Sequence, residues 1–167
     1  MEESVAGTGG TEKGSDGFFE EIREYYKMQD VDLRTYSPLT LAFIGDGVYE
    51  LVIRSLIVGR GNAKPGRLHA HTSHLVRAES QAELIEVILP ELSEEEQDFY
   101  RRGKNAKPQT MAKNASPEAY HTATGFETLM GYLYLTGQTK RMLYLIGAGL
   151  DGIGAAETAD FADHTDA

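Results

Sequence analysis

Cysteine is missing from all 167 residues of the sequence. Its absence excludes disulfides, zinc–thiolate sites and thiol catalysis. A continuous membrane-spanning run is missing too, because Asp46, Glu50 and Arg54 interrupt the apolar stretch 39–58. The first residues are acidic and rich in glycine, threonine and serine, without the basic start and apolar middle of a signal peptide. We therefore expect one soluble, cytoplasmic domain with a sizeable core.

Positive charge is scarce, with 16 basic against 26 acidic residues and a formal net charge of −10. The excess acid lies at the ends of the chain: residues 1–17 carry −3 and residues 151–167 carry −5, which leaves −2 for residues 18–150. Both ends lack an apolar period. We therefore predict disordered tails at 1–17 and 151–167 around a single domain at 18–150.

Within this domain five of the 15 basic residues cluster in one segment, 101–113, which contains no acid. Gly103 and Pro108 predict that much of the segment is loop. A solvated surface loop is the simpler interpretation, but the lack of compensating acids favours an anion-binding role, and a phosphate backbone is the obvious anion. Asn105 fits a turn-forming role equally well. The candidate RNA-binding residues are Arg101, Arg102, Lys104, Asn105, Lys107 and Lys113.

Apolar residues recur at helical spacing throughout the domain, and no alternating strand pattern is present. Ser37-Pro38 and Ser116-Pro117 are strong helix starts, and Ser93 with Glu96 forms a capping box. The predicted helices cover 18–28, 38–58, 65–76, 79–89, 94–102, 117–136 and 139–148. We predict an all-α helical bundle whose two Ser-Pro helices are central, because both are apolar on most sides.

Each of these two helices carries a carboxylate in apolar surroundings, Asp46 in the first and Glu127 in the second. An unpaired buried carboxylate is costly, so such groups usually have a cation or a hydrogen-bond network. Two acids of this kind favour a metal site over a salt bridge. Glu50, one turn beyond Asp46, is a secondary candidate, although an ion pair with Arg54 is the preferred interpretation. Small residues that let a backbone, a metal or a phosphate come close flank both acids: Gly45, Gly47, Gly125 and Gly131.

Two other metal-binding patterns fail. Histidines at 69, 71 and 74 point to different sides of a helix and cannot converge, although with nearby bases they form a possible second basic patch. Glu118 and His121 match half of a carboxylate-bridged di-iron motif, but the second half is absent.

Several segments resemble a known family. Leu-Ala-Phe-Ile-Gly-Asp-Gly-Val-Tyr-Glu at 41–50 is similar to the signature helix of the ribonuclease III catalytic domain, and 124–135 is similar to its second catalytic helix. The segments 101–107 and 80–83 resemble the short subgroup, Mini-ribonuclease III. The resemblance covers about residues 37–148.

The resemblance has departures from full-length ribonuclease III. Ala42 stands where a glutamate is usual, and Thr124 stands where an aspartate is usual. Both changes are expected of the Mini subgroup, which keeps fewer carboxylates. Residues 151–167 are too few and too polar to form a double-stranded-RNA-binding domain.

The resemblance implies a homodimeric endoribonuclease that cuts double-stranded RNA with Mg²⁺ held by Asp46 and Glu127. The implied substrate is precursor 23S ribosomal RNA, with or without a ribosomal protein bound to it, and the implied products carry 5′-phosphate and 3′-hydroxyl groups. Apolar faces around Phe43, Val48 and Tyr49 are compatible with a dimer. The alternative is a non-catalytic RNA-binding or ribosome-assembly module. The neutral residues at 42 and 124 support it, and the two retained acids oppose it.

Overall fold

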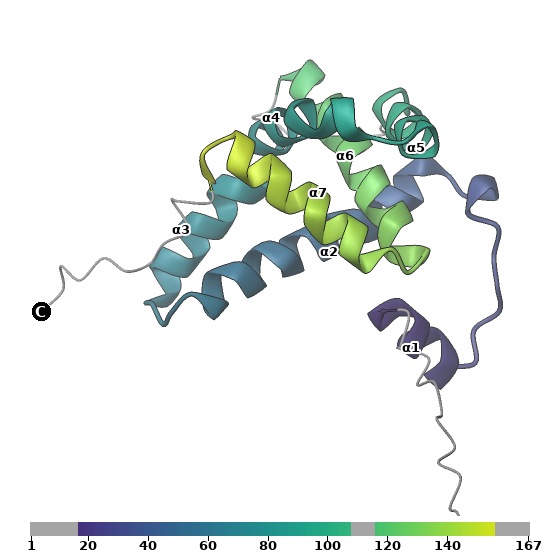
Figure 1. Cartoon of the computed structure of the whole chain (residues 1–167), viewed down its shortest axis with the longest axis horizontal. Helices are drawn as coiled ribbons and strands as arrows, with labels where there is room; N and C mark the ends of the chain where they lie inside the picture. The colour runs from purple at the N-terminus through teal and green to yellow at the C-terminus, as the bar shows by residue number, and fades with distance from the viewer. Residues whose placement is uncertain (1–16, 108–115, 156–167) are drawn as a thin grey trace, which may run out of the picture.

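The computed structural model describes residues 17–107 and 116–155, and all regular structure within them is helical, as predicted. In Figure 1, α6 crosses α2 at the centre, α7 lies beside them, and α1 sits apart at the end of a long connector. Two short 3₁₀ helices, Leu33–Thr35 and Leu89–Glu91, were not predicted. The α-helices are α1 (Phe18–Tyr25), α2 (Pro38–Gly59), α3 (Pro65–Val76), α4 (Ala78–Ile88), α5 (Glu94–Lys104), α6 (Pro117–Leu135) and α7 (Thr139–Gly152).

Side-chain caps set the helix starts that the sequence predicts. The Ser37 and Ser116 hydroxyls accept hydrogen bonds from the backbone N–H groups of Leu39 and Ala119, at 3.2 and 3.1 Å. The capping box at Ser93 and Glu96 is complete. These bonds satisfy N–H groups that have no partner within a helix.

The largest differences from the predicted helices are at the ends of the first and the last helix. The first helix ends at Tyr25, and Lys27 just beyond it has a left-handed φ of 53°, which interrupts a right-handed helix. The last helix continues past the predicted end at 148 to Gly152, and Ala155 beyond it is buried in the core. Helical glycines at 147 and 149 therefore do not end it. Of the predicted tails at 1–17 and 151–167, residues 1–16 and 156–167 lie outside the described residues. Residues 151 and 152 of the second predicted tail belong to the last helix.

The core is built around α2 and α6. Among its fully buried side chains are Leu41 and Ile53 from α2 and Phe126, Leu129 and Leu133 from α6. Val48 and Tyr49 are also buried here, so they belong to the core of one protomer rather than to a dimer face. Burial of this apolar surface is the main force that fixes the crossing of the two helices.

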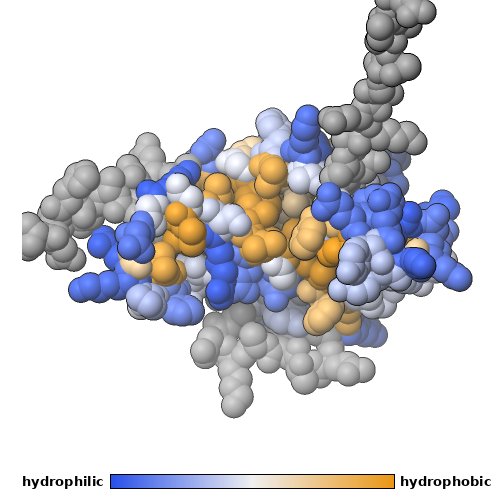
Figure 2. Space-filling view, turned by 90° about the horizontal axis from the view of Figure 1, so that it is seen from below, coloured by the Kyte–Doolittle hydropathy of each residue, from blue (hydrophilic) through white to orange (hydrophobic). Residues whose placement is uncertain are grey.

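An apolar stripe on α2 remains in contact with solvent. Phe43 is 82% exposed, and Leu51 and Val58 on the same face are 55% and 65% exposed. Figure 2 shows apolar residues gathered on the underside of the molecule. Within the described residues, no helix is both long and apolar enough for a membrane crossing.

Candidate active site

The two predicted acids meet where the backbones of α2 and α6 touch. A Cβ atom on Gly45 would lie 1.8 Å from the carbonyl oxygen of Glu127, and one on Gly131 would lie 2.0 Å from that of Leu41. Only glycine permits contacts this short. Of the three uses predicted for the small residues, close approach of another backbone is the one seen at Gly45 and Gly131, whereas a Cβ on Gly47 would meet nothing within 4 Å. The contact places Asp46, next in sequence to Gly45, beside Glu127.

The negative charges of these two acids repel each other. Burial, with a contribution from the Asp46 charge, raises the pKa of the half-buried Glu127 carboxyl to about 8. The Asp46 side chain is exposed to solvent, yet desolvation by surrounding protein and the charge of Glu50 raise its pKa as well. Proximity of like charges and burial both disfavour ionisation, and a bound cation would reverse both effects.

Glu50 lies one turn beyond Asp46 and forms the predicted ion pair. Arg54 donates to one Glu50 carboxylate oxygen from Nη2 at 2.9 Å and from Nε at 3.2 Å. In the described part of the chain, no group of three or more histidine, cysteine, aspartate or glutamate side chains is placed to hold a metal ion. A cation at the crossing would therefore take two protein carboxylates and complete its shell with water, which is the habit of Mg²⁺.

The neutral residues at 42 and 124 serve the packing of the helices. Ala42 is 5% exposed and Thr124 is 7% exposed. The Thr124 hydroxyl donates to the carbonyl of Tyr120 at 2.9 Å, within its own helix. Both positions are thus occupied by groups that bring no charge to the site.

Gln81 on α4 is a site residue that the sequence did not single out. Its side chain is 1% exposed, and its amide lies close enough to Glu127 to lower the pKa of that carboxyl against the larger effect of burial. A signal was present, because Gln81 stands in helical register with the apolar residues Leu84, Ile85 and Ile88. A polar residue in such a register requires a buried partner.

The basic segment is more helical than predicted, because α5 continues to Lys104. Arg101, Arg102 and Lys104 occupy its last turn, where positive charge stabilises the carbonyl end of a helix. Asn105 caps the helix through its backbone N–H, which donates to Arg101 at 2.9 Å. The side chains of Arg101, Lys104, Asn105 and Lys107 are exposed, whereas Lys113 lies outside the described residues.

Arg102 differs from its neighbours because it points into the fold. Its Nη2 donates to the carbonyls of Tyr36 at 3.1 Å and Arg34 at 3.4 Å, and its guanidinium lies 5.3 Å from the centre of the Phe99 ring. Arg102 thereby ties the end of α5 to the connector before α2.

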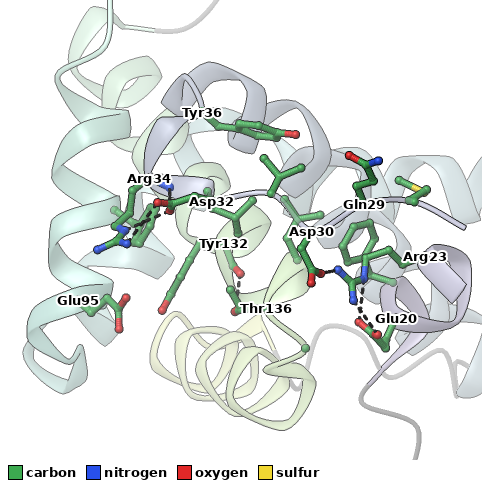
Figure 3. A pocket seen from close by; sticks show the side chains of 17 residues that line it. Glu20, Arg23, Gln29, Asp30, Asp32, Arg34, Tyr36, Glu95, Tyr132 and Thr136 are labelled. Atoms are coloured by element: carbon green, nitrogen blue, oxygen red, sulfur yellow. Dashed lines mark hydrogen bonds and ion pairs between the residues drawn. The ribbon is translucent and has the colours of Figure 1, made fainter.

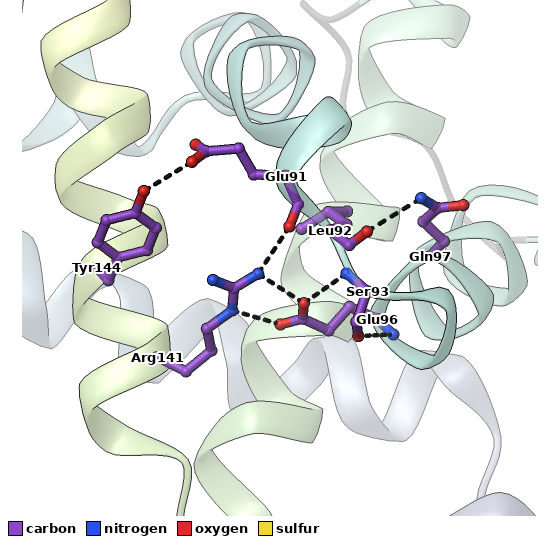
Figure 4. Close-up of polar contacts among 7 residues, drawn as sticks. All are labelled: Glu91, Leu92, Ser93, Glu96, Gln97, Arg141 and Tyr144. Carbon is purple, nitrogen blue, oxygen red and sulfur yellow. Dashed lines mark hydrogen bonds and ion pairs between the residues drawn. The ribbon is translucent and has the colours of Figure 1, made fainter.

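The beginning of α5 is anchored as well (Figure 4). Glu96 is 4% exposed and accepts hydrogen bonds from Nε and Nη2 of Arg141 on α7, at 3.0 and 2.9 Å. Burial would raise the pKa of Glu96, but the bonds from Arg141 and Ser93 outweigh it and lower the pKa. With both ends of α5 held, the exposed bases have a fixed position relative to α6.

A cavity of about 640 Å³ lies away from the two acids, between α1, its connector, α5 and α6. Figure 3 shows charged side chains at its walls. Arg34 hydrogen-bonds to Asp32, and Arg23 pairs with Glu20 and Asp30. Because these arginines face acids, the cavity is a poor match for an anion and takes no part in the carboxylate site.

Comparison with known proteins agrees with the observed fold. A family model described as the ribonuclease III domain matches residues 39–138. Mini-ribonuclease 3 of Enterococcus faecalis is 45% identical over 125 residues, 74% of this chain and 95% of that protein. Mini-ribonuclease 3 of a Thermoanaerobacter species is 47% identical over 131 residues, 78% and 90% of the two chains. A crystal structure of a Fusobacterium nucleatum protein superposes with a TM-score of 0.67 at 29% identity, over 74% of this chain and 99% of that one.

Proposed function

This chain belongs to the ribonuclease III family and is an endoribonuclease, and from that premise we propose that it cleaves double-stranded RNA with Mg²⁺ held by Asp46 and Glu127. One observation carries the proposal: the crossing of α2 and α6 brings together two carboxylates of raised pKa. Such a pair is a poor structural element and a good cation ligand.

The residues at the crossing suit magnesium. Mg²⁺ prefers oxygen ligands and keeps several waters, so two carboxylates are sufficient. The Gln81 Oε1 atom is buried and has no hydrogen-bond partner among the described residues, so it offers a further oxygen to a hydrated ion. When bound, the ion supplies charge stabilisation at the phosphoryl group and lowers the pKa of water.

The protein's own residues then have separate roles. Asp46 and Glu127 bind the cation, and Glu50, held by Arg54, adds negative charge beside Asp46 as a secondary residue of the site. In-line attack of water on a phosphodiester, with the P–O3′ bond breaking and the 3′ oxygen leaving as a hydroxyl, would leave 5′-phosphate and 3′-hydroxyl ends. No side-chain nucleophile is required for this reaction.

Assembly into a homodimer would suit a duplex substrate. Phe43 lies on the same turn as Asp46 and is 82% exposed, so a second copy covering the α2 stripe would bury it. Two-fold symmetry would then set one site against each RNA strand. By family resemblance, the proposed substrate is the paired end of precursor 23S ribosomal RNA in the cytoplasm, free or carrying a ribosomal protein.

Cleavage of a long RNA duplex tests the proposal. We expect Mg²⁺-dependent cutting that EDTA stops, and Asp46→Asn and Glu127→Gln should each reduce the rate by about a thousandfold, several kcal/mol of lost stabilisation. Asp151→Asn is the matched control, because it removes one exposed acid from α7. Wild-type cleavage by Asp46→Asn would contradict the assignment of the site.

The same assay separates the alternative, a non-catalytic RNA-binding or ribosome-assembly module. The neutral residues Ala42 and Thr124 favour that function, since they reduce the number of acids at the crossing. Duplex that is retarded in a gel but left uncut by the wild-type protein with Mg²⁺ would establish it.

For RNA binding, we propose that Arg101, Lys104 and Lys107 contact phosphates, with Asn105, Arg102 and Lys113 as further members of the segment. Replacing the first three with glutamine should raise the KM more than it lowers kcat, and should reduce the salt slope of binding by about two to three. Lys140→Gln, at an exposed base on α7, is the control. An unchanged KM would argue against the segment.

A further inference from the structure

The corner between α3 and α4 is closed by three side chains. A helix leaves its last carbonyls without partners. Here the carbonyls of His74, Leu75 and Val76 accept hydrogen bonds from the Ser80 hydroxyl, the Tyr49 hydroxyl and Gln81 Nε2, at 2.5, 2.8 and 2.8 Å. The backbone of Arg77 between the helices is extended. The corner therefore has a fixed geometry, and Gln81 is one of the groups that fix it.

Gln81 connects this corner to Glu127. Its Nε2 carries two N–H groups, and one of them donates to the Val76 carbonyl. The same amide lies beside the Glu127 carboxyl and lowers its pKa. Rotating the amide by 180° would turn Oε1 toward the Val76 carbonyl oxygen, so this acceptor defines the orientation of the amide. The amide is 1% exposed, which leaves it little freedom to move.

The other end of the same amide is unsatisfied. Oε1 of Gln81 is buried and has no hydrogen-bond partner within the described part of the chain. A buried acceptor without a donor is destabilising unless a water or a ligand completes it. The atom belongs to the amide that lies beside Glu127, so it lies at the edge of the carboxylate site.

We propose that Gln81 is a positioning residue of the cation site: Nε2 holds the Glu127 carboxylate in its binding orientation, and Oε1 accepts a hydrogen bond from a water of the hydrated cation. The inference rests on the proposed function and deepens it, because it adds a neutral group from a third helix to the two acids. Groups that orient ligands in this way typically change metal affinity by about 10–100-fold.

The test is binding of Mn²⁺ to the full chain without RNA, followed by the free-ion signal in electron paramagnetic resonance. Gln81→Met keeps the length of the side chain and removes the amide, and Gln81→Asn keeps an amide too short to reach both acceptors. Ser80→Ala is the matched control, because it also removes a bond of the corner. Melting curves in EDTA report the stability of each variant.

We expect both Gln81 variants to bind Mn²⁺ about tenfold or more weakly, with Ser80→Ala within about twofold of the wild type. If Gln81→Met does not fold, the result for Gln81→Asn decides. Affinity within twofold of the wild type in a folded Gln81 variant, or equal weakening in Ser80→Ala, would overturn the role of Gln81. A wild-type protein that binds no Mn²⁺ and cuts no duplex would instead remove the proposed function itself.

Discussion

Two helix contacts in this protein differ in kind: α2 and α6 cross with their backbones in contact, whereas α1 is attached through side chains. At the crossing, glycines let backbones touch, and eleven residues of α6 are buried. On α1 no residue is buried. The helix is held by side chains: the ring centres of Phe19 and Tyr134 are 5.6 Å apart, and Arg23 forms an ion pair with Asp30 of the connector. Backbone contact fixes position more rigidly than side-chain contact, and the two acids lie at the crossing. The comparison shows that the chemistry is placed where the fold has least freedom.

We expect the largest effect from Gly45→Ala, which disrupts the backbone contact between α2 and α6. Its methyl group would overlap the Glu127 carbonyl, so the helices must separate, at about 3 kcal/mol of stability, and cleavage should fall about a hundredfold as the acids part. Gly147→Ala on α7, where a Cβ meets open space, should instead stabilise by about 0.5–1 kcal/mol. Chemical denaturation and cleavage rates measure both. A Gly45→Ala protein as stable and active as the wild type would remove the argument from close contact.

Arg141→Met tests how much the ion pair between α7 and α5 contributes to stability, compared with the backbone contact at the crossing. The change leaves the buried Glu96 carboxylate without its guanidinium, so we expect a loss of about 2–3 kcal/mol in the free energy of unfolding. The pKa of Glu96 is lowered in the fold, so the stability from this pair is present above its ordinary value of 4.5 and is lost on acidification. The variant should therefore differ most from the wild type at neutral pH. Equal stability at pH 7 would show that water replaces Arg141.

The pH dependence of Glu127 sharpens the contrast, because it measures the strain at the crossing. With a folded pKa of about 8 against an ordinary 4.5, the native state binds this proton more tightly than the unfolded chain does. In EDTA, stability should therefore fall as pH rises from 4.5 to 8, by about 1 kcal/mol after allowance for partial exposure, or roughly 3 °C. Melting of Glu127→Gln should lack this slope. Mn²⁺ should remove the slope from the wild type, and its persistence with saturating Mn²⁺ would contradict cation binding by Glu127.

Phe19→Ala probes the loosely held side and should have the smallest effect. Loss of the contact with Tyr134 should cost about 0.5–1 kcal/mol, confined to α1, and should leave kcat/KM unchanged. Faster proteolysis of the 26–32 connector is the expected readout. Phe18→Ala, at a ring that is 61% exposed, is the control. A global loss of stability equal to that of Gly45→Ala would mean that α1 is part of the core.

The sequence predicted the helices and the placing of the acids because these depend on local pattern. Ser37 and Ser116 cap their helices as expected, and Asp46 and Glu127 lie on the two central ones. What the sequence could not supply is which distant groups meet. The bonds of Arg102 to carbonyls 66 and 68 residues away, and the position of Gln81 beside Glu127, depend on how whole helices are placed. Periodicity also grouped Phe43 with Val48 and Tyr49, although only the packing of α6 decides which of them is covered.

One turn of α2 serves three tasks in different directions: Gly45 touches α6, Asp46 faces the acid site, and Phe43 faces solvent. Each residue of a helix is rotated by about 100° from the one before it. Inserting a single residue between 41 and 46 would therefore rotate the residues on either side of the insertion relative to each other by about 100°. The contact with α6, the acid site and the exposed face could then no longer all be kept. We therefore expect related chains to keep the length of this turn and to vary in length instead in the 60–64 link after α2.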